Sequence, residues 1–447
     1  MTEVQSPFTS SYLPADAELR STLHNEVHAR PQARIRMPAL VLYVAVLNEG
    51  VSREQECAHL RQLPGQQGLE LEQLQGNFLR LRLDGYTMKW ERHSEYTRYS
   101  LVQPLPPHAL LGTHDPQLLE TLVLPPEWLR NIPGRTIAAI KLAMVHGDLN
   151  DAEATVALAQ RWFGEQAMVA SVMGHNGHSW ALTDFRLRDS GFERMLVIGP
   201  NDTSQTRAGR VSQRLLELET YRLMALRGLP VAKELAPMLA ASEAELADIT
   251  TRLENKSAAD QDLLDTLVSL SARVERATAT HMYRFSATRA YQALVEQRIA
   301  ELREATIPGI QTIGEFMQRR LSPAMATVAA TAQRLASLSE RVARASALLR
   351  TRVDIATELQ NQQLLAKLTR GQELQLHLQT TVEGLSIAAI SYYVVSLLLY
   401  GAKAMKAAGV PINPEVAAGA LMPLVLWAVW SATRRVHKSV VASSKQG

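Results

Sequence analysis

The stretch GLSIAAISYYVVSLLLYGA, residues 384–402, contains no charged side chain. A second uncharged stretch, VAAGALMPLVLWAVWSAT, occupies residues 416–433. A helix rises about 1.5 Å per residue, so each stretch would reach about 27–29 Å, close to the roughly 30 Å hydrocarbon core of a bilayer. The two stretches therefore predict a pair of transmembrane helices, with the lipid bilayer as a partner. The alternative is a pair of buried helices in a soluble core.

The basic residues around these stretches predict their orientation. Five of them lie outside the pair and two lie in the connecting loop: Lys367, Arg370, Arg434, Arg435 and Lys438 against Lys403 and Lys406. Lys and Arg are enriched on the cytoplasmic side of membrane proteins. We therefore expect an inner-membrane protein with both termini and the bulk of the chain in the cytoplasm. The hairpin would cover 384–433, followed by a basic cytoplasmic tail at 434–447.

Composition agrees with a folded, intracellular chain. Of the 447 residues, 46% are hydrophobic and 20% are charged, which is typical of globular proteins. The only cysteine, Cys57, cannot form an internal disulfide and fits a reducing compartment. Residues 1–20 lack the basic and apolar regions of a secretory signal. The net charge of +3 gives no reason to expect a nucleic-acid partner, which requires a concentrated basic surface.

Residues 1–205 read as a cytosolic α/β domain. Apolar runs at 37–47 and 136–145 predict strands. Residues 77–102 alternate on both sides of Asp84-Gly85, a pair typical of tight hairpin turns. A second hairpin is expected over 178–199, around 189–191. With the helices that follow, the chain is predicted to be α+β.

Residues 206–383 are predicted to form a helical bundle or stalk. Pro308 and Gly309 interrupt one helical run, and a second run has no breaker from Pro323 to Gly371. If it stays helical to Glu383, the second run reaches about 90 Å and leads into the first apolar stretch. Apolar residues at three- and four-residue spacing predict packing along other helices and, as a coiled coil, a homo-oligomer. They include Leu335, Leu338, Val342, Ala345, Leu349, Ala356 and Leu359. A set of shorter bundle helices is the alternative.

Several longer motifs carry a family resemblance. They are LHNEVHARP, WERHSEY, LETYRLMALRGLP, RVDIATELQNQQLL and LQTTVEGLSIAAISYY, and they extend over nearly the whole chain. Together they resemble the bacterial domain-of-unknown-function family 3422, whose members are described as predicted membrane-anchored proteins. The resemblance implies a C-terminal membrane anchor. It implies no activity and supplies no catalytic residues.

A second resemblance concerns architecture alone. A cytosolic α/β domain, a long helix and two C-terminal spans are similar to CorA-type magnesium channels, whose first span ends in Tyr-Gly-Met-Asn. This chain has Tyr400 and Gly401 but then Ala402 and Lys403. A ring of lysines at a cation entrance would repel the ion. If the spans did conduct, the candidate pore-lining residues would be Ser391, Ser396, Tyr400 and Gly401.

Histidines and carboxylates near the N-terminus form a candidate metal site. His24, Glu26 and His28 lie within five positions, and His93 in WERHSEY could add a ligand. On a helix, His24 and His28 share one face, whereas on an extended chain all three point the same way. A divalent metal is the cofactor that this pattern suggests. The alternatives are a ligand-binding or catalytic site, or structural residues that pair with nearby arginines.

These patterns support three functional hypotheses. The first is a membrane-anchored, oligomeric cytosolic scaffold or sensor without enzymatic turnover. The second is a CorA-like oligomeric ion transporter or channel, and the third is a metal-dependent enzyme that uses the N-terminal histidines. The chain shows no H-E-x-x-H helix, P-loop or dinucleotide-binding fingerprint, and no residue is identified as catalytic.

Overall fold

The computed structural model describes residues 17–20, 23–24, 33–105, 122–164, 168–255, 260–409, 411 and 413–443. The strands are β1 (Ala39–Leu47), β2 (Phe78–Leu83), β3 (Tyr86–Arg92), β4 (Tyr96–Pro104), β5 (Arg135–His146), β6 (Val169–Met173), β7 (Ser179–Thr183) and β8 (Glu193–Gly199). The helices before α6 are α2 (Arg53–Leu60), the short 3-10 helix η1 (Leu71–Leu74), α4 (Pro126–Arg130) and α5 (Ala152–Phe163). The later helices are α6 (Gln205–Leu226), α7 (Gly228–Asn255), α8 (Asp260–Leu302), α9 (Ile313–Arg320), α10 (Ser322–Ala407) and α11 (Pro414–Ser443).

Eight strands form one mixed sheet in the order β2-β3-β4-β1-β5-β8-β7-β6. The paired neighbours are antiparallel except β5 and β8, which run parallel. The parallel pair is possible because α5, β6 and β7 lie between β5 and β8 in the chain, long enough for a crossover. The predicted N-terminal α/β region is confirmed as a mixed-sheet domain with helices.

The predicted hairpins form, with one difference in detail. β2 and β3 are joined at Asp84-Gly85, and Gly85 has the positive φ of 78° that such a turn requires. β7 and β8 also pair antiparallel, but residues 184–192 connect them, a longer connection than a tight turn at 189–191. An ion pair between Asp184 and Arg188 lies inside this connection.

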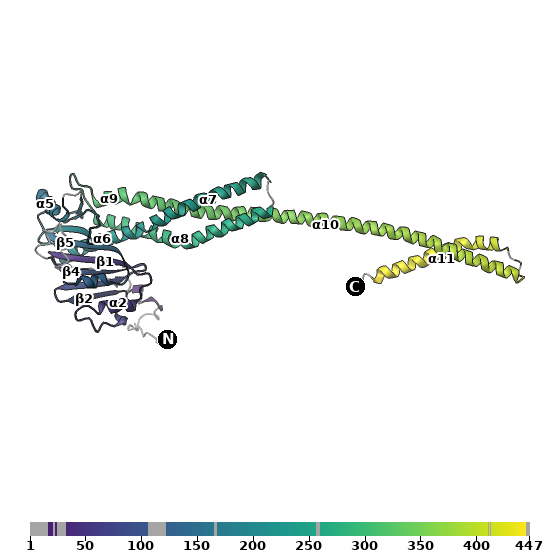
Figure 1. Ribbon diagram of the computed structural model, residues 1–447, viewed down its shortest axis with the longest axis horizontal. Coiled ribbons are helices and arrows are strands. Elements are labelled where there is room, and N and C mark those ends of the chain that lie inside the picture. Colours follow the sequence, from purple (N-terminus) through teal and green to yellow (C-terminus); the bar gives the residue numbers. More distant parts are fainter. Residues whose placement is uncertain are drawn as a thin grey trace. The chain divides into compact units, whose positions relative to one another are not determined.

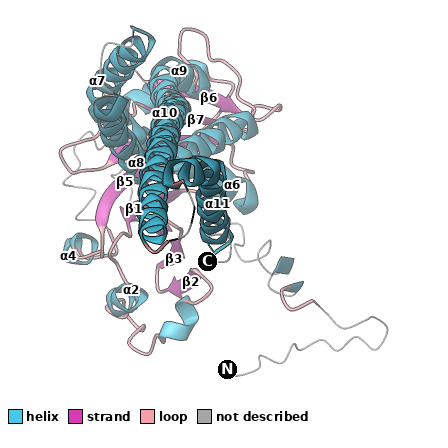
Figure 2. Cartoon of the chain, turned by 90° about the vertical axis from the view of Figure 1, so that its right-hand side faces the viewer, coloured by secondary structure: helices cyan, strands magenta, loops and turns pink. Residues whose placement is uncertain are grey.

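Helices cover both faces of the sheet (Figure 2). Alternate residues of β1, such as Leu40 and Leu42, belong to a core with Trp128 of α4 and Leu60 of α2. The residues between them face the other side, where the Tyr43 hydroxyl lies 2.7 Å from the Thr220 hydroxyl of α6. α6 therefore packs on the opposite face from α2 and α4.

Three long helices, α7, α8 and the first part of α10, lie side by side (Figure 1). Their buried residues repeat every three or four positions: Leu235, Leu239 and Leu246 of α7, Leu267, Leu270 and Val274 of α8, and Leu335, Leu338 and Val342 of α10. The stripe that predicted a coiled coil is thus largely buried within the chain's own helices as far as Leu349, which is 0% exposed.

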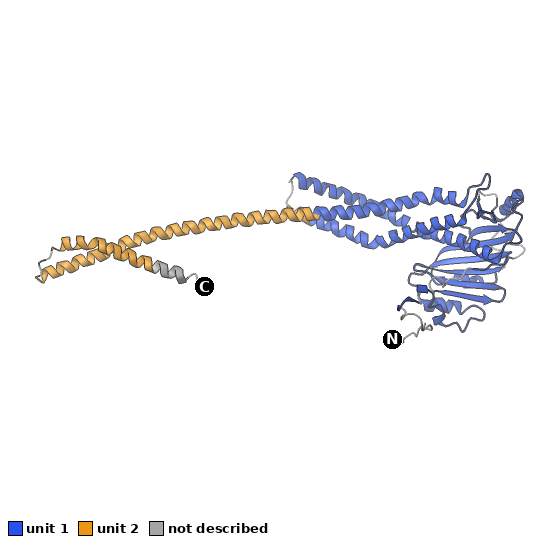
Figure 3. Ribbon diagram, turned by 180° about the vertical axis from the view of Figure 1, so that it is seen from behind, with its two compact units in different colours: residues 1–258, 265–345 blue, residues 259–264, 346–447 orange. Residues whose placement is uncertain are grey.

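The chain divides into two compact units (Figure 3). Unit 1 comprises residues 1–258 and 265–345, so the sheet and the bundle belong together. Unit 2 comprises residues 259–264 and 346–447. α10 is a single helix of 86 residues, so the alternative of shorter helices over 323–383 is wrong. The domain limits at 205, 383 and 433 stay predictions.

Two helices are long and apolar enough to cross a membrane. They are the apolar part of α10 and the segment Pro414–Arg435 of α11, which belong to unit 2. Only 6% of the first apolar window and 11% of the second is buried. Within the described residues, most of both windows is therefore exposed, unlike the buried core helices of a soluble domain.

Candidate ligand-binding site

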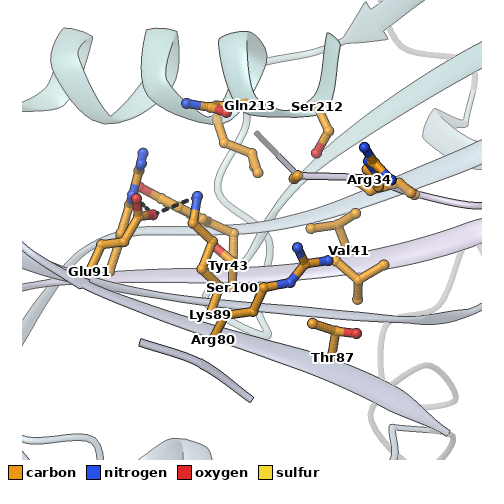
Figure 4. Close-up of a pocket in the computed structure, with 15 residues that line it drawn as sticks. Arg34, Val41, Tyr43, Arg80, Thr87, Lys89, Glu91, Ser100, Ser212 and Gln213 are labelled. Atoms are coloured by element: carbon orange, nitrogen blue, oxygen red, sulfur yellow. Dashed lines mark hydrogen bonds and ion pairs between the residues drawn. The ribbon is translucent and has the colours of Figure 1, made fainter. Parts of the chain in front are cut away.

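A cavity lies between the sheet and α6 in unit 1 (Figure 4). It contains about 620 Å³ of space, part of which is open to solvent. Its walls come from the segment Ala33–Ile35, strands β1 to β4 and three residues of α6, Ser212, Gln213 and Leu216. The segment from Ala33 can approach α6 closely because position 209 is glycine. A Cβ there would lie 1.7 Å from the Ala33 carbonyl oxygen.

The lining combines apolar walls with a few polar groups. Ile35, Val41, Val102 and Leu216 supply apolar surface, whereas Thr87, Ser100 and Ser212 supply hydroxyl groups. Four cationic side chains, Arg34, Arg80, Lys89 and Arg98, face one carboxylate, Glu91. Small-molecule sites are commonly lined in this way, with apolar surface and a few oriented polar groups.

Glu91 is the centre of a buried ion network at the inner wall. Its carboxylate accepts a hydrogen bond from Arg98 Nε and lies 3.0 Å from Lys89 Nζ. The network continues into the helices, since Arg98 Nη1 donates to Glu217 of α6 at 3.1 Å. Glu217 also accepts from Arg298 Nε of α8 at 2.7 Å. The side chains of Glu91, Arg98 and Glu217 are each no more than 5% exposed.

Electrostatics keep these carboxylates ionised. Burial alone would raise the pKa of Glu91, but Arg98 and Lys89 outweigh it and lower that pKa to about 2. Burial would likewise raise the pKa of Glu217, and Arg98, Gln213 and Arg298 lower it. Burial lowers the pKa of Lys89, and Glu91 opposes this shift. The inner wall therefore holds fixed charges that are already neutralised in pairs.

The free positive charge lies elsewhere in the cavity. Arg34 and Arg80 form no ion pair or side-chain hydrogen bond with any residue that the structure describes. In Figure 4 the Arg80 side chain reaches toward Val41, and Arg34 is drawn on the other side of Val41. A guanidinium binds a carboxylate or phosphate through two parallel hydrogen bonds. The cavity can therefore hold a small organic anion, with its apolar part against the sheet.

Within the described part of the chain, the predicted metal ligands do not lie close together. His24 is exposed, and Glu26 and His28 lie outside the described residues. His93 follows β3, where its ring stacks on Tyr96 with 4.5 Å between centroids. Across the described ranges, no three His, Cys, Asp or Glu side chains gather as a metal site. The metal site stays a prediction.

The other carboxylates of WERHSEY have arginine partners. Glu91 belongs to the ion network, and Glu95 accepts two hydrogen bonds from Arg284 of α8, at 2.7 and 3.1 Å. Arg92, between them, donates to Glu56 of α2 at 2.7 Å. Glu91, Arg92 and Glu95 thus have oppositely charged partners, as expected of structural residues that pair with nearby charges.

The candidate pore residues lie on the apolar part of α10. Ser391 is 4% exposed, while Ser396 is half-buried. Tyr400 is 68% exposed, and a Cβ at Gly401 would meet no atom within 4 Å. Lys403 Nζ lies 5.9 Å from the Tyr400 ring centroid. A pore-lining role for these residues stays a prediction.

Sequence reasoning missed most of the cavity. Arg34 belongs to the nearby arginines that the sequence suggests only as partners for the N-terminal motif, and no sequence motif identifies Arg80, Lys89 or Arg98 as site residues. A signal existed in FLRLRL, where Arg80 and Arg82 alternate with leucines and so share one face of β2. In the antiparallel register Arg80 lies opposite Lys89, which places two cations side by side.

Comparison with known proteins agrees with the resemblance read from the motifs. A search of curated proteins finds no match. A family model described as "Protein of unknown function (DUF3422)" matches residues 15–440, almost the entire chain. The chain therefore belongs to the DUF3422 family.

Proposed function

We propose that this protein is a membrane-anchored sensor whose sheet domain binds a small organic anion, a carboxylate with an apolar body. The observation that carries the proposal is the cavity beneath α6, where Arg34 and Arg80 have no described counter-ion and face apolar walls. Arg34 is exposed and Arg80 is half-buried, so both guanidinium groups are accessible to a ligand, and each can bind a carboxylate through two parallel hydrogen bonds.

The ion network connects the wall of the cavity to helices α6 and α8, so a ligand bound in the cavity can affect both helices. Lys89 and Arg98 contact Glu91 at the wall of the cavity, and Arg98 also holds Glu217 of α6. An anion near Lys89 competes with Glu91 for the Lys89 ammonium group. This competition weakens or strengthens the hydrogen bond from Arg98 to Glu217. Arg298 links the same carboxylate to α8. Binding would thereby change how α6 and α8 pack, and this is the change that a sensor passes on.

The anchor in this proposal is the hairpin of α10 and α11 in the inner membrane. Its support is the low burial of the two apolar helices and the basic residues flanking them, Arg434 and Arg435 above all. Large apolar side chains such as Leu397 and Trp427 are 70% and 65% exposed. Lipid is the environment in which such surface is stable.

Self-association is proposed through the part of α10 that packs against no other described helix. Residues 354–382 are exposed on every side, and helices of this kind gain most of their stability from packing. Leu364, Leu368, Leu378 and Val382 are 57–67% exposed and fall on one seven-residue repeat. Leu378→Asp should dissociate the oligomer in detergent, measured by sedimentation velocity. Gln379→Asp, off the repeat, should leave the oligomer intact.

Ligand binding is tested on the full-length protein in detergent. Benzoate and succinate are added while thermal unfolding is followed by tryptophan fluorescence. A ligand at 100 times its Kd stabilises the folded state by about 2.7 kcal/mol. We expect one of the two probes to raise Tm in the wild type and in Arg82→Ala, and to have a much smaller effect in Arg80→Ala.

The two arginine variants separate a cavity site from a general charge effect. Arg80 lines the cavity, whereas Arg82 is exposed two residues further along the same strand. Equal responses in both variants, or no response of the wild type to either carboxylate, would refute binding of a small organic acid in this cavity.

A further inference from the structure

A second pocket, which we call the basic pocket, lies in unit 1 between α6, the β6–β7 turn and the end of α8. It contains about 940 Å³ of space, part of it open to solvent. Its charged and titratable lining residues are Arg207, Arg210, Arg214, Arg303, His175, His178 and Glu301. With neutral histidines, four positive charges face a single negative charge. The cavity beneath α6 described above has a different set of lining residues.

The single carboxylate is already engaged. Glu301 accepts a hydrogen bond from Arg298 Nη1 at 2.8 Å, and its other oxygen lies 3.4 Å from Arg214 Nε. Within the described ranges, Arg207, Arg210 and Arg303 have neither an ion pair nor a side-chain hydrogen bond. The basic pocket therefore has a positive charge that the described fold does not neutralise.

The three arginines of α6 are also unfavourable for the helix itself. Arg207, Arg210 and Arg214 are spaced by three and four residues, so they lie on one face of α6. Like charges at this spacing destabilise a helix. Arg207 also lies in the first turn of α6, where the helix dipole favours negative charge. Helix stability does not explain this arrangement.

The backbone conformation of the β6–β7 turn places the His178 ring against the basic pocket. Gly174 and Gly177 have φ angles of 77° and 57°. A Cβ at Gly174 would lie 2.6 Å from the ring of His178, so only glycine permits this ring position. The Gly174 amide donates to the Leu302 carbonyl at 3.0 Å, which ties the turn to the end of α8.

The end of α8 presents its last cation in an uncommon backbone conformation. Arg303 directly follows α8 and has a φ of 49°, which non-glycine residues seldom adopt. Such conformations often occur at ligand sites, where the surrounding structure compensates for the strain. Three separate segments thus place their cationic or imidazole groups around one concave surface.

We propose that the basic pocket binds a soluble, phosphate-bearing polyanion with the charge and size of a diphosphate. Several guanidinium groups from different elements match several phosphoryl oxygens, and each can bind in a bidentate manner. A monocarboxylate would engage one arginine and leave the others unpaired. Among the described lining residues, the histidines are the only aromatic side chains that could stack on a base, so phosphate groups provide the recognition.

The test uses full-length protein in a neutral detergent and pyrophosphate as the probe. Isothermal titration calorimetry compares the wild type, Arg207→Ala/Arg210→Ala and Arg276→Ala. Arg276 is an exposed arginine of α8 outside the basic pocket. We expect the wild type and Arg276→Ala to bind equally and the double variant to bind at least 10-fold more weakly. The wild-type affinity should fall as salt is raised, because exposed charges are screened.

Two further titrations distinguish a soluble diphosphate from other anions that could bind in the basic pocket. Sulfate tests whether any tetrahedral anion suffices, and dihexanoylphosphatidylglycerol presents a lipid phosphate. Tighter binding of either than of pyrophosphate would overturn the proposal, as would equal binding by the double variant and the wild type.

A chemical readout avoids dependence on the variant's folding. Phenylglyoxal modifies accessible arginines, and mass spectrometry of the wild type quantifies modification at Arg207 and Arg210. We expect pyrophosphate to protect both arginines and leave Arg276 unprotected. Unchanged modification of Arg207 and Arg210 at saturating pyrophosphate would also overturn the proposal.

Discussion

Replacing Glu91 with glutamine tests the buried ion network at the cavity. The substitution keeps the shape of the side chain but removes its charge. Arg98 then retains only Glu217, and Lys89 loses its carboxylate partner at 3.0 Å. Because Lys89 and Arg98 are largely removed from water, their charges are poorly compensated by solvent. Breaking a buried pair by removing one partner is strongly destabilising.

The lowered pKa of Glu91 gives the size of the expected loss in the free energy of unfolding. That pKa is lowered from 4.5 to about 2, and each unit corresponds to about 1.4 kcal/mol. The ionised carboxylate therefore contributes on the order of 3 kcal/mol to the free energy of unfolding at neutral pH. A lowered pKa means that this contribution is present above pH 4.5 and is lost as pH falls towards 2. At pH 3 less than half of it, about 1.4 kcal/mol, remains.

Thermal unfolding of the full-length protein in detergent measures the effect. Tryptophan fluorescence is the readout, since Trp90 is fully buried in the core on the opposite face of β3 from Glu91. At pH 7 we expect Glu91→Gln to lower Tm by about 5 °C. The difference from the wild type should shrink to less than half at pH 3. Glu243→Gln is the control because Glu243 pairs with Arg334 at the surface, where ion pairs contribute about 0–1 kcal/mol. A difference between Glu91→Gln and the wild type that is equal at both pH values would refute the reasoning.

Three other predictions concern burial, packing and the membrane. Burial, and next Glu219, raise the pKa of Glu193 to about 9, so the folded state keeps it protonated while the unfolded state ionises above pH 4.5. Glu193→Gln should therefore raise Tm at pH 8 and leave it unchanged at pH 4, whereas a lower Tm at pH 8 would contradict the assignment. Gly209→Ala places a Cβ 1.7 Å from the Ala33 carbonyl oxygen and should speed proteolysis near Ala33. Gly76→Ala, where a Cβ meets nothing within 4 Å, should have no such effect, and equal cleavage of the two variants would contradict the packing. The full chain should remain in the membrane pellet after carbonate extraction, and a C-terminal tag should be cleaved by protease only in inverted vesicles. Release by carbonate, or cleavage from outside intact spheroplasts, would contradict the anchor or its orientation.

Local sequence signals predicted the elements well. Asp84-Gly85 supplies the positive φ of a tight turn, and the alternating residues on each side form β2 and β3 as expected. Similarly, the absence of a breaker after Pro323 predicted the long helix α10. Turn chemistry and side-chain periodicity are properties of neighbouring residues, so a single sequence contains them.

Partners distant in sequence were not predictable in this way. The stripe Leu335, Leu338 and Val342 was correctly read as a packing surface, but periodicity alone does not say whether its partner is another copy or the same chain. Glu95 and Arg284 illustrate the same limit, since 189 positions separate them. The cavity requires β1 to β4 and α6 to come together, and that arrangement depends on the order of strands in the sheet.

Helix α6 gives the two proposed sites a common physical basis. Gln213 and Leu216 line the cavity, while Arg210 and Arg214 of the same helix line the basic pocket. Alternating charges connect the two sites: Glu91, Arg98, Glu217, Arg298, Glu301 and Arg214. Each of these pairs balances mutual attraction against desolvation, so a new charge placed near one pair changes the energy of that pair. An anion bound at either end changes the charge balance of the same chain of residues. Since coupling between two binding sites is reciprocal, each ligand would then alter the affinity for the other by the same factor.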